Sequence, residues 1–192
     1  MQRCFGSGDP LYEAYHDQEW GRSVPDSPHE SALFERLVLE GFQSGLSWVT
    51  VLRKREAFRA AFAGFDPTKV AAFTAEDEQR LLADQGIIRN QAKIRAAIGN
   101  AQALLRLHAD GLRLADLLAK HAPAPRPEPP RTLADVPGST AESKALSQRL
   151  KKLGFRFVGP VTMYATMQAI GLVNDHLADC WVRQIPQDAP AV

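Results

Sequence analysis

The chain has 192 residues, of which 45% are hydrophobic and 23% charged, so it is an ordinary globular composition with enough apolar residues to bury a core. The formal net charge is +1, which means that binding to nucleic acid would need a local basic surface. No apolar run reaches the length of a membrane span, and the N-terminus shows no signal-peptide pattern. We therefore expect a cytoplasmic protein with no membrane partner, and nothing in the composition demands more than a monomer.

Helix signals follow one another along the chain and predict an all-α fold. Ser27, Pro28 and Glu30 form the pattern of a capping box, which predicts a helix over residues 28–43. Further helices are predicted to begin at Asp66–Pro67, Thr74, Asn90, about Ser139 and Gly159–Pro160. Alternating patterns are nearly absent, and only residues 155–159 could form a short extended piece.

Residues 122–131, APAPRPEPPR, are too rich in proline to be helical. We interpret them as an exposed connection between two helical lobes. With no internal repeat visible, we treat residues 1–192 as one domain.

The two cysteines lie near the two ends of the chain, and each has a histidine close by. His176 and Cys180 are four residues apart, which on a helix would place both on one face. Cys4 and His16 could complete a set of two sulfur and two nitrogen ligands, which zinc favours in closed structural sites. The alternative is that both cysteines are small buried apolar residues. The other histidines are expected on the surface: His29, His108 and His121.

A glutamate interrupts the apolar face of the helix predicted over residues 28–43. Glu40 continues the spacing of Leu33 and Leu37, and a carboxyl group on such a face is costly unless it is paired or lines a pocket. Trp48 follows, and a carboxylate beside an aromatic ring suits a flat cationic ligand. Tyr12 and Tyr15, three residues apart, would add two more rings on one helix face. Alternatively, these rings are core residues and Glu40 accepts from a buried backbone amide.

Residues 81–95 predict a helix, a turn and a second helix. Gly86 ends the first helix and Asn90 caps the second, so backbone N–H groups at the turn could hold an anion. Arg89, Lys93 and Arg95 add positive charge, and such a hairpin can grip a DNA backbone without reading bases. Two other basic clusters, residues 53–55 and 149–152, are equally consistent with solvated helix faces.

Four ordered blocks make the chain resemble 3-methyladenine DNA glycosylase I, the Tag type, in the helix-hairpin-helix superfamily. The blocks are "RC" with DPLYEAYHDQEWG, LFERLVLEGFQSGLSWVTVLRKREAFRAAFAGFDPTKVA, GIIRNQAKIRAAIGNA and LKKLGFRFVGPVTMYATMQAIGLVNDHLADC. The resemblance covers about residues 3–183. It implies a structural zinc on Cys4, His16, His176 and Cys180. It also implies a base pocket at Glu40, Trp48, Tyr12 and Tyr15, and a DNA-gripping hairpin at Gly86 and the helix that follows.

The resemblance implies hydrolysis of the N-glycosidic bond of 3-methyladenine in alkylated double-stranded DNA, with Glu40 bonded to a base flipped out of the duplex. The superfamily usually has a catalytic aspartate soon after the hairpin, but here none comes before Asp110, so we expect catalysis mainly by binding. Gln43 and Leu46 are candidates to fill the gap in the DNA. Asp175 is a candidate to orient His176, or else a helix cap.

One position departs from the family. Its members carry a tryptophan shortly after the first cysteine, whereas this chain has Phe5, which would offer a smaller ring to the base. This departure supports one alternative, a non-catalytic protein that binds DNA or a modified base on the same fold. A second alternative, independent of Phe5, is a zinc hydrolase in which the metal activates water. Four protein ligands would close the metal site, which disfavours the hydrolase.

Overall fold

The computed structural model describes residues 2–185, and within that range the chain is helical and contains no strand. The all-α prediction is confirmed, and residues 155–159 form no strand. None of the described helices combines the length and apolarity that crossing a bilayer requires. The α-helices are α1 (Pro10–Gln18), α2 (Ser31–Gln43), α3 (Trp48–Leu52), α4 (Arg55–Ala61), α5 (Pro67–Ala71), α6 (Ala75–Ala83), α7 (Gln91–Ala109), α8 (Leu114–Ala119), α9 (Ala141–Lys152) and α10 (Pro160–Ala169). The 3-10 helices are η1 (Ala63–Phe65), η2 (Leu133–Asp135) and η3 (Trp181–Gln184).

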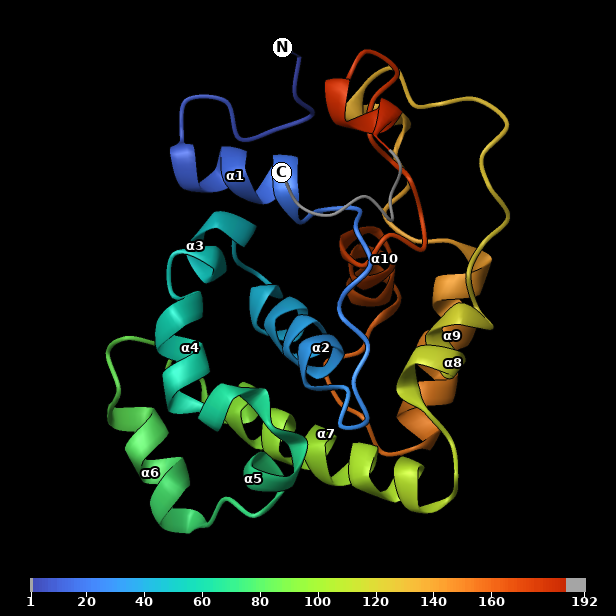
Figure 1. Ribbon diagram of the computed structural model, residues 1–192. Helices are drawn as coiled ribbons and strands as arrows, with labels where there is room; N and C mark the ends of the chain where they lie inside the picture. The colour runs from blue at the N-terminus through green and yellow to red at the C-terminus, as the bar shows by residue number, and fades with distance from the viewer. Residues whose placement is uncertain (1, 186–192) are drawn as a thin grey trace.

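Helix α2 runs through the middle of the molecule (Figure 1). It contacts α3 and α7 on one side and α10 on the other, while α5 and α6 pack on α7 and α9 packs on α10. Its side chains are buried almost all round, including Phe34, Leu37, Leu39 and Phe42. A helix whose side chains are buried on most of its faces lies inside the fold, so α2 joins the two groups of helices that the sequence predicted as lobes.

A run of phenylalanines fills the core between α2 and η1. Phe42 and Phe58 have ring centroids 4.7 Å apart, and Phe62 stacks on Phe65 at 5.6 Å with nearly parallel planes. All four side chains are fully buried. Aromatic pairs of this kind add to the free energy gained from burying their area, so they hold α2 firmly in register with its neighbours.

Most predicted helix starts are confirmed by side-chain caps. The carboxylate of Asp66 accepts from the backbone N–H groups at the start of α5, and the side chain of Asn90 accepts from Lys93 N at the start of α7. Thr74 takes part in a capping box with Asp77 at α6. These caps satisfy N–H groups that have no partner within their own helix.

The capping box predicted at Ser27 is wrong. α2 begins only after Glu30, whose backbone is left-handed (φ 50°) and whose side chain makes no hydrogen bond to its own helix. The buried Glu30 carboxylate instead accepts from the backbone N–H groups of Leu114 and Ala115, at 2.8 and 2.7 Å, and contacts His108 Nε2 at 2.8 Å. Glu30 therefore caps α8, a distant helix, and half-buries a histidine that was expected on the surface.

The helix predicted to carry His176 and Cys180 ends too early to do so. α10 stops at Ala169, and Gly171 takes a positive φ of 78° while Leu172 N donates to Met167 O at 2.9 Å. This is the hydrogen-bond pattern of a glycine C-cap, which turns the chain out of the helix. Residues 174–180 are irregular, so the four-residue spacing does not have the helical meaning given to it.

The proline-rich segment is non-helical, as predicted, but it is more than an exposed connection. Arg126 forms an ion pair with the fully buried Asp175 at 3.0 Å, and Ala178 N donates to Pro130 O at 2.8 Å. The segment therefore lies along the loop of residues 170–180 between α10 and η3, called the C-terminal loop below (Figure 1). At the other end of the chain, Trp181 N donates to Gln2 O at 3.2 Å, so the N-terminal segment also lies against this loop.

Candidate functional site

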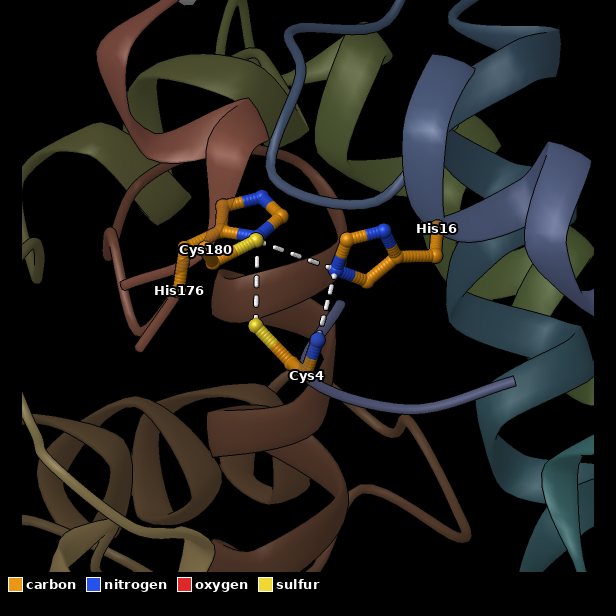
Figure 2. A group of neighbouring side chains, drawn as sticks. All are labelled: Cys4, His16, His176 and Cys180. Carbon is orange, nitrogen blue, oxygen red and sulfur yellow. Dashed lines mark hydrogen bonds between the residues drawn. The ribbon is translucent and has the colours of Figure 1, made fainter. Parts of the chain in front are cut away.

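The four predicted metal ligands meet in one buried cluster (Figure 2). Their ligand atoms all lie within 4.8 Å of one another. Cys180 Sγ is 3.5 Å from both His16 Nε2 and His176 Nδ1, and Cys4 Sγ is 3.6 Å from His176 Nδ1. His16 comes from α1, Cys4 from the segment before it, and the other two from the C-terminal loop.

These separations fit a tetrahedral cation. Bonds of about 2.3 Å to sulfur and about 2.0 Å to nitrogen in tetrahedral geometry place a sulfur and a nitrogen ligand about 3.5 Å apart. The observed sulfur–nitrogen distances are 3.5 and 3.6 Å. The buried Cys₂His₂ cluster is therefore able to hold a metal ion, and it joins the two ends of the described chain.

Groups behind the histidines fix which ring nitrogen faces the cluster. His16 Nδ1 contacts Asp17 Oδ1 at 2.8 Å, and His176 Nε2 lies 3.3 Å from Trp20 O. A histidine that donates one ring N–H to an oxygen presents the other nitrogen as a ligand. The proposed orienting role of Asp175 toward His176 is not what the structure shows, because the Asp175 carboxylate instead accepts from Tyr164, Gln168 and Arg126.

The electrostatics of the cluster suit a cation. Burial lowers the pKa of His176 to about 4, so its imidazole is neutral at physiological pH, as a ligand must be. Burial raises the pKa of the Cys4 thiol to about 12, while the backbone N–H of Leu177 donates to its sulfur at 3.2 Å. A bound cation is the group that would favour the thiolate in such a place.

A second site lies beside α2. Glu40, at 4% exposure, lines a cavity of about 210 Å³. That is smaller than the about 300–1,000 Å³ typical of pockets for drug-sized ligands, so it suits a single small ring system. The predicted residues Phe5, Tyr12, Tyr15 and Trp48 all line this cavity, as does Gln43.

The aromatic rings of the cavity contact one another. Tyr15 lies 5.2 Å from Trp48 and 6.4 Å from Tyr12, and Phe5 lies 4.9 Å from Tyr12 by ring centroids. The indole N–H of Trp48 is buried and has no hydrogen-bond partner in the described chain. Phe5 therefore stands among the rings of the cavity despite the departure from the family pattern.

Glu40 is buried without a hydrogen bond or an ion pair among the described residues. Burial raises the pKa of its carboxyl group to about 8, and the charge of Arg36 opposes that rise. Arg36 itself donates to Glu19 Oε2 at 2.6 Å, and Arg55 pairs with the same carboxylate. The Glu40 carboxyl is thus a polar group beside aromatic rings that is left for a ligand.

The predicted hairpin is present between α6 and α7. Gly86 lies in the turn, and Lys54 donates to Gln85 O and Gly86 O at 2.8 and 3.2 Å, which ties the turn to the start of α4. Arg89 is exposed, with no partner among the described residues. Arg95 pairs with Glu78 on α6 at 2.7 Å.

Lys93 is not exposed on the hairpin. Its Nζ donates to Phe42 O at 2.9 Å and to Ser44 O at 2.6 Å, at the C-terminal end of α2. The ammonium is mostly buried and already holds two carbonyl acceptors, so we do not retain it as a phosphate ligand. It instead fastens the turn that follows α2. Gly45 in that turn has a positive φ of 80°, and Leu46 beside it is 42% exposed.

Several residues of the cavity were missed by the sequence reasoning. They are Trp20, Leu133, Val136, Ala165 and Gln168, together with Asp175, which the sequence had suggested only as a partner of His176 or a helix cap. Leu133 and Val136 follow the proline-rich segment, and the last three lie in or after α10. Only Trp20, four residues after His16, lay close enough in the sequence to the predicted rings to be suspected.

An all-α fold, a hairpin between α6 and α7 and a buried carboxyl among aromatic rings fit the helix-hairpin-helix DNA glycosylases that the sequence resembles. The family model for methyladenine glycosylase matches residues 5–184. The chain therefore belongs to the methyladenine glycosylase family, and the predicted family and enzyme class are confirmed.

Individual relatives agree over nearly the full length. The chain is 51% identical to DNA-3-methyladenine glycosylase 1 of Escherichia coli (strain K12), covering 94% of this chain and 96% of the relative. A crystal structure of 3-methyladenine DNA glycosylase I superposes with a TM-score of 0.88 at 48% identity, covering 94% of this chain and 98% of that one. A second structure, a tyrosine-to-phenylalanine variant of a 3-methyladenine DNA glycosylase I in complex with 3-methyladenine, gives a TM-score of 0.86 at 37% identity, covering 95% of this chain and 98% of that one.

Proposed function

We propose that the protein removes 3-methyladenine from alkylated double-stranded DNA by binding the flipped base in the Glu40 cavity and hydrolysing its N-glycosidic bond. The observation that carries this proposal is the buried Glu40 carboxyl, which has no partner of its own and faces a cavity lined by Phe5, Tyr12, Tyr15 and Trp48. A relative solved in complex with 3-methyladenine supports the choice of base.

Selectivity in this proposal comes from charge. Methylation at N3 makes the base in DNA cationic, whereas unmodified adenine is neutral. A cation beside Glu40 favours the ionised carboxylate, whose pKa burial otherwise raises to about 8. Neutral adenine offers no positive charge to stabilise the ionised form of that buried group, so it binds less well. The rings of the cavity add stacking that both bases share.

Hydrolysis then needs little chemical assistance. The cationic base leaves with the electron pair of the N-glycosidic bond and becomes neutral, and the oxygen of a water molecule bonds to the sugar carbon and loses its proton. Glu40 bonds to the base rather than attacking the sugar, and it is the catalytic group because it touches the reacting base. No aspartate stands between Asn90 and Asp110 on α7, so the superfamily's usual carboxylate has no counterpart in that helix.

In this proposal the DNA backbone is bound by a part of the protein separate from the base cavity. The N–H groups of the turn around Gly86 and the exposed guanidinium of Arg89 contact phosphates. Gln43, which lines the cavity, and the exposed Leu46 fill the space that the flipped nucleotide leaves. The cytoplasmic location and the monomeric state remain predictions from sequence.

The metal in this proposal is one zinc ion held by Cys4, His16, His176 and Cys180. Zinc there supplies a structural cross-link rather than chemistry, because four protein ligands close a tetrahedral sphere. The ligands join the segment before α1 to the C-terminal loop. Trp20, whose carbonyl meets His176, also lines the cavity, so the cross-link lies behind one wall of the base site.

Glu40→Gln tests the proposed role of the carboxyl group. The variant keeps the shape but cannot carry the negative charge that pairs with a cationic base, so we expect release of 3-methyladenine from methylated DNA to fall about 10- to 100-fold, the worth of a charged hydrogen bond. Released base is measured by chromatography. Unchanged kinetics in a variant with full metal content would remove Glu40 from its role. Binding of methylated DNA by the wild-type protein with no released base would favour the non-catalytic alternative.

A further inference from the structure

The cavity holds a second polar side chain whose orientation is fixed by the fold. Gln168 on α10 lines the cavity together with Glu40, and its Nε2 donates to Asp175 Oδ2 at 2.9 Å. Asp175 is 1% exposed and is also paired with the guanidinium of Arg126. A carboxylate offers acceptors only, so the amide nitrogen, not the oxygen, has to face it.

Other contacts hold Asp175 itself in place. Tyr164 Oη donates to Asp175 Oδ2 at 2.6 Å, and Arg126 donates to Oδ1 at 3.0 Å and to Asp135 O at 2.9 Å. The carboxylate is therefore anchored from α10 and from the proline-rich segment. Gln168 hydrogen-bonds to a group that cannot easily move, and its amide cannot flip without turning its oxygen toward a carboxylate.

The other end of the Gln168 amide is free. No described residue donates to its carbonyl oxygen, and the oxygen is not among the buried polar atoms that lack a partner. The amide oxygen is therefore an acceptor without a donor among the described residues, its direction fixed by the bond of Nε2 to Asp175, on a side chain that lines the cavity. A second donor group on the ligand is what such an acceptor would bind.

We propose that Gln168 is a specificity-determining residue that accepts a hydrogen bond from the 6-amino group of the bound purine. An adenine ring carries a donor at position 6, whereas hypoxanthine and guanine rings carry a carbonyl oxygen there. An acceptor held toward an amino group binds it, and the same acceptor facing a carbonyl oxygen repels it. The inference rests on the proposed function. In it, Gln168 distinguishes purines by the group at position 6, whereas Glu40 distinguishes them by charge.

The experiment compares two free bases on one protein sample. 3-Methyladenine and 3-methylhypoxanthine are nearly the same size and differ at position 6 and its neighbouring nitrogen, and their affinities are measured by calorimetry. Gln168→Met keeps the length of the side chain without an acceptor. We expect it to weaken 3-methyladenine binding about 10-fold and to reduce the preference for it over 3-methylhypoxanthine by at least that factor. A ratio is read within each variant, so a loss of folded protein cancels.

Further measurements keep the test decisive. Gln102→Met is the matched control, since Gln102 is exposed on α7 and donates to Ala71 O; it should leave the ratio unchanged. Should Gln168→Met not fold, Gln168→Asn, one methylene shorter, should lower the ratio too. An unchanged ratio in the folded variant overturns the inference, as does equal affinity of the wild-type protein for the two bases. A wild-type protein that binds 3-methyladenine but excises none would instead sink the proposed function.

Discussion

Two buried glutamates show how the surroundings of a side chain decide its role. Glu30 and Glu40 are 2% and 4% exposed. Glu30 accepts from Leu114 N and Ala115 N and contacts His108, so its oxygens are satisfied within the fold. Glu40 has no hydrogen bond among the described residues and faces the cavity. Burial of an unsatisfied carboxyl group costs free energy, and for that reason we propose Glu40, and not Glu30, as the ligand-binding glutamate.

The raised pKa of Glu40 should make the free energy of unfolding depend on pH. Its pKa is raised from 4.5 to about 8 in the folded state, so the folded protein binds one more proton than the unfolded chain between those values. Stability from this group is therefore full below about pH 4.5 and is lost as the pH rises through about 8. The charged and titratable groups facing it are Arg36, Tyr12 and Tyr15.

Glu40→Gln should remove that pH dependence. We expect the variant to melt about 5 °C or more above the wild-type protein at pH 9, and within about 2 °C of it at pH 5. The reason is that the buried wild-type carboxyl is ionised, and therefore destabilising, only at the higher pH. The comparison is made by thermal unfolding at both values. Equal differences in melting temperature at pH 5 and pH 9 would show that Glu40 does not titrate in this range.

At the scale of elements, the hairpin and the turn after α2 are braced against each other. Lys93, in the first turn of α7, donates to Phe42 O and Ser44 O, and Lys54 donates to the carbonyls of the hairpin turn. Both lysines bond to the C-terminal carbonyls of a neighbouring helix or turn, which otherwise lack partners. The two elements proposed to touch DNA therefore form one rigid surface.

Lys93→Met should act on stability rather than on phosphate binding. We expect a loss of about 2 kcal/mol in the free energy of unfolding, from two carbonyl groups left without their charged donor. It should leave the salt dependence of DNA binding as in the wild-type protein, because its ammonium is not on the surface. Urea unfolding and binding titrations measure the two effects. Lys69→Met is the control, since Lys69 is exposed and its ion pair with Asp66 is long, at 3.9 Å. A flatter salt dependence in Lys93→Met would return Lys93 to the phosphate contacts.

Arg89→Ala should act on DNA binding instead. Removal of one phosphate contact lowers the slope of log K against log salt by about 0.9 and weakens binding to all sequences alike. Arg106→Ala, an exposed position near the C-terminal end of α7, the helix that follows Arg89, is the control. The two slopes would be indistinguishable if Arg89 touched no phosphate.

At the scale of the whole molecule, the ends of the described chain close around the metal-ligand cluster. Cys4 and His16 meet His176 and Cys180, while Trp181 N donates to Gln2 O. Chain ends fray unless something holds them, and a bound cation that binds only the folded state stabilises it. Loss of the cation should therefore loosen the segment before α1, which carries Phe5 to the base cavity.

Cys180→Ser should abolish stoichiometric zinc and lower the melting temperature by about 10 °C or more, because a serine hydroxyl is a poor zinc ligand. Elemental analysis and thermal unfolding give the two values. Wild-type protein stripped with a chelator should melt near the variant, and added zinc should restore only the wild-type protein. Full zinc retention by Cys180→Ser would contradict the proposed ligand set.

The sequence by itself determined the helical class, most helix starts, the four residues of the Cys₂His₂ cluster and the carboxyl group and aromatic rings on one side of the cavity. Asp66, Thr74 and Asn90 cap helices within a few residues of their own position, so these caps can be predicted from the sequence alone. The four ordered motif blocks pointed to the family, and the four predicted ligand residues meet even though residues 174–180 are not helical.

Only the tertiary structure decided which distant group each polar side chain serves. Glu30 caps α8 instead of its own helix, Lys93 turns inward to α2, and Arg126 leaves the proline-rich segment to anchor Asp175, which in turn orients Gln168. The contacts of Glu30, Lys93 and Arg126 join residues that lie 84, 51 and 49 positions apart in the sequence, whereas Asp175 and Gln168 are 7 apart. The physical reason is that a capping signal acts over one helical turn, whereas the partner of a buried charge is chosen by whichever segment the fold brings within about 3 Å.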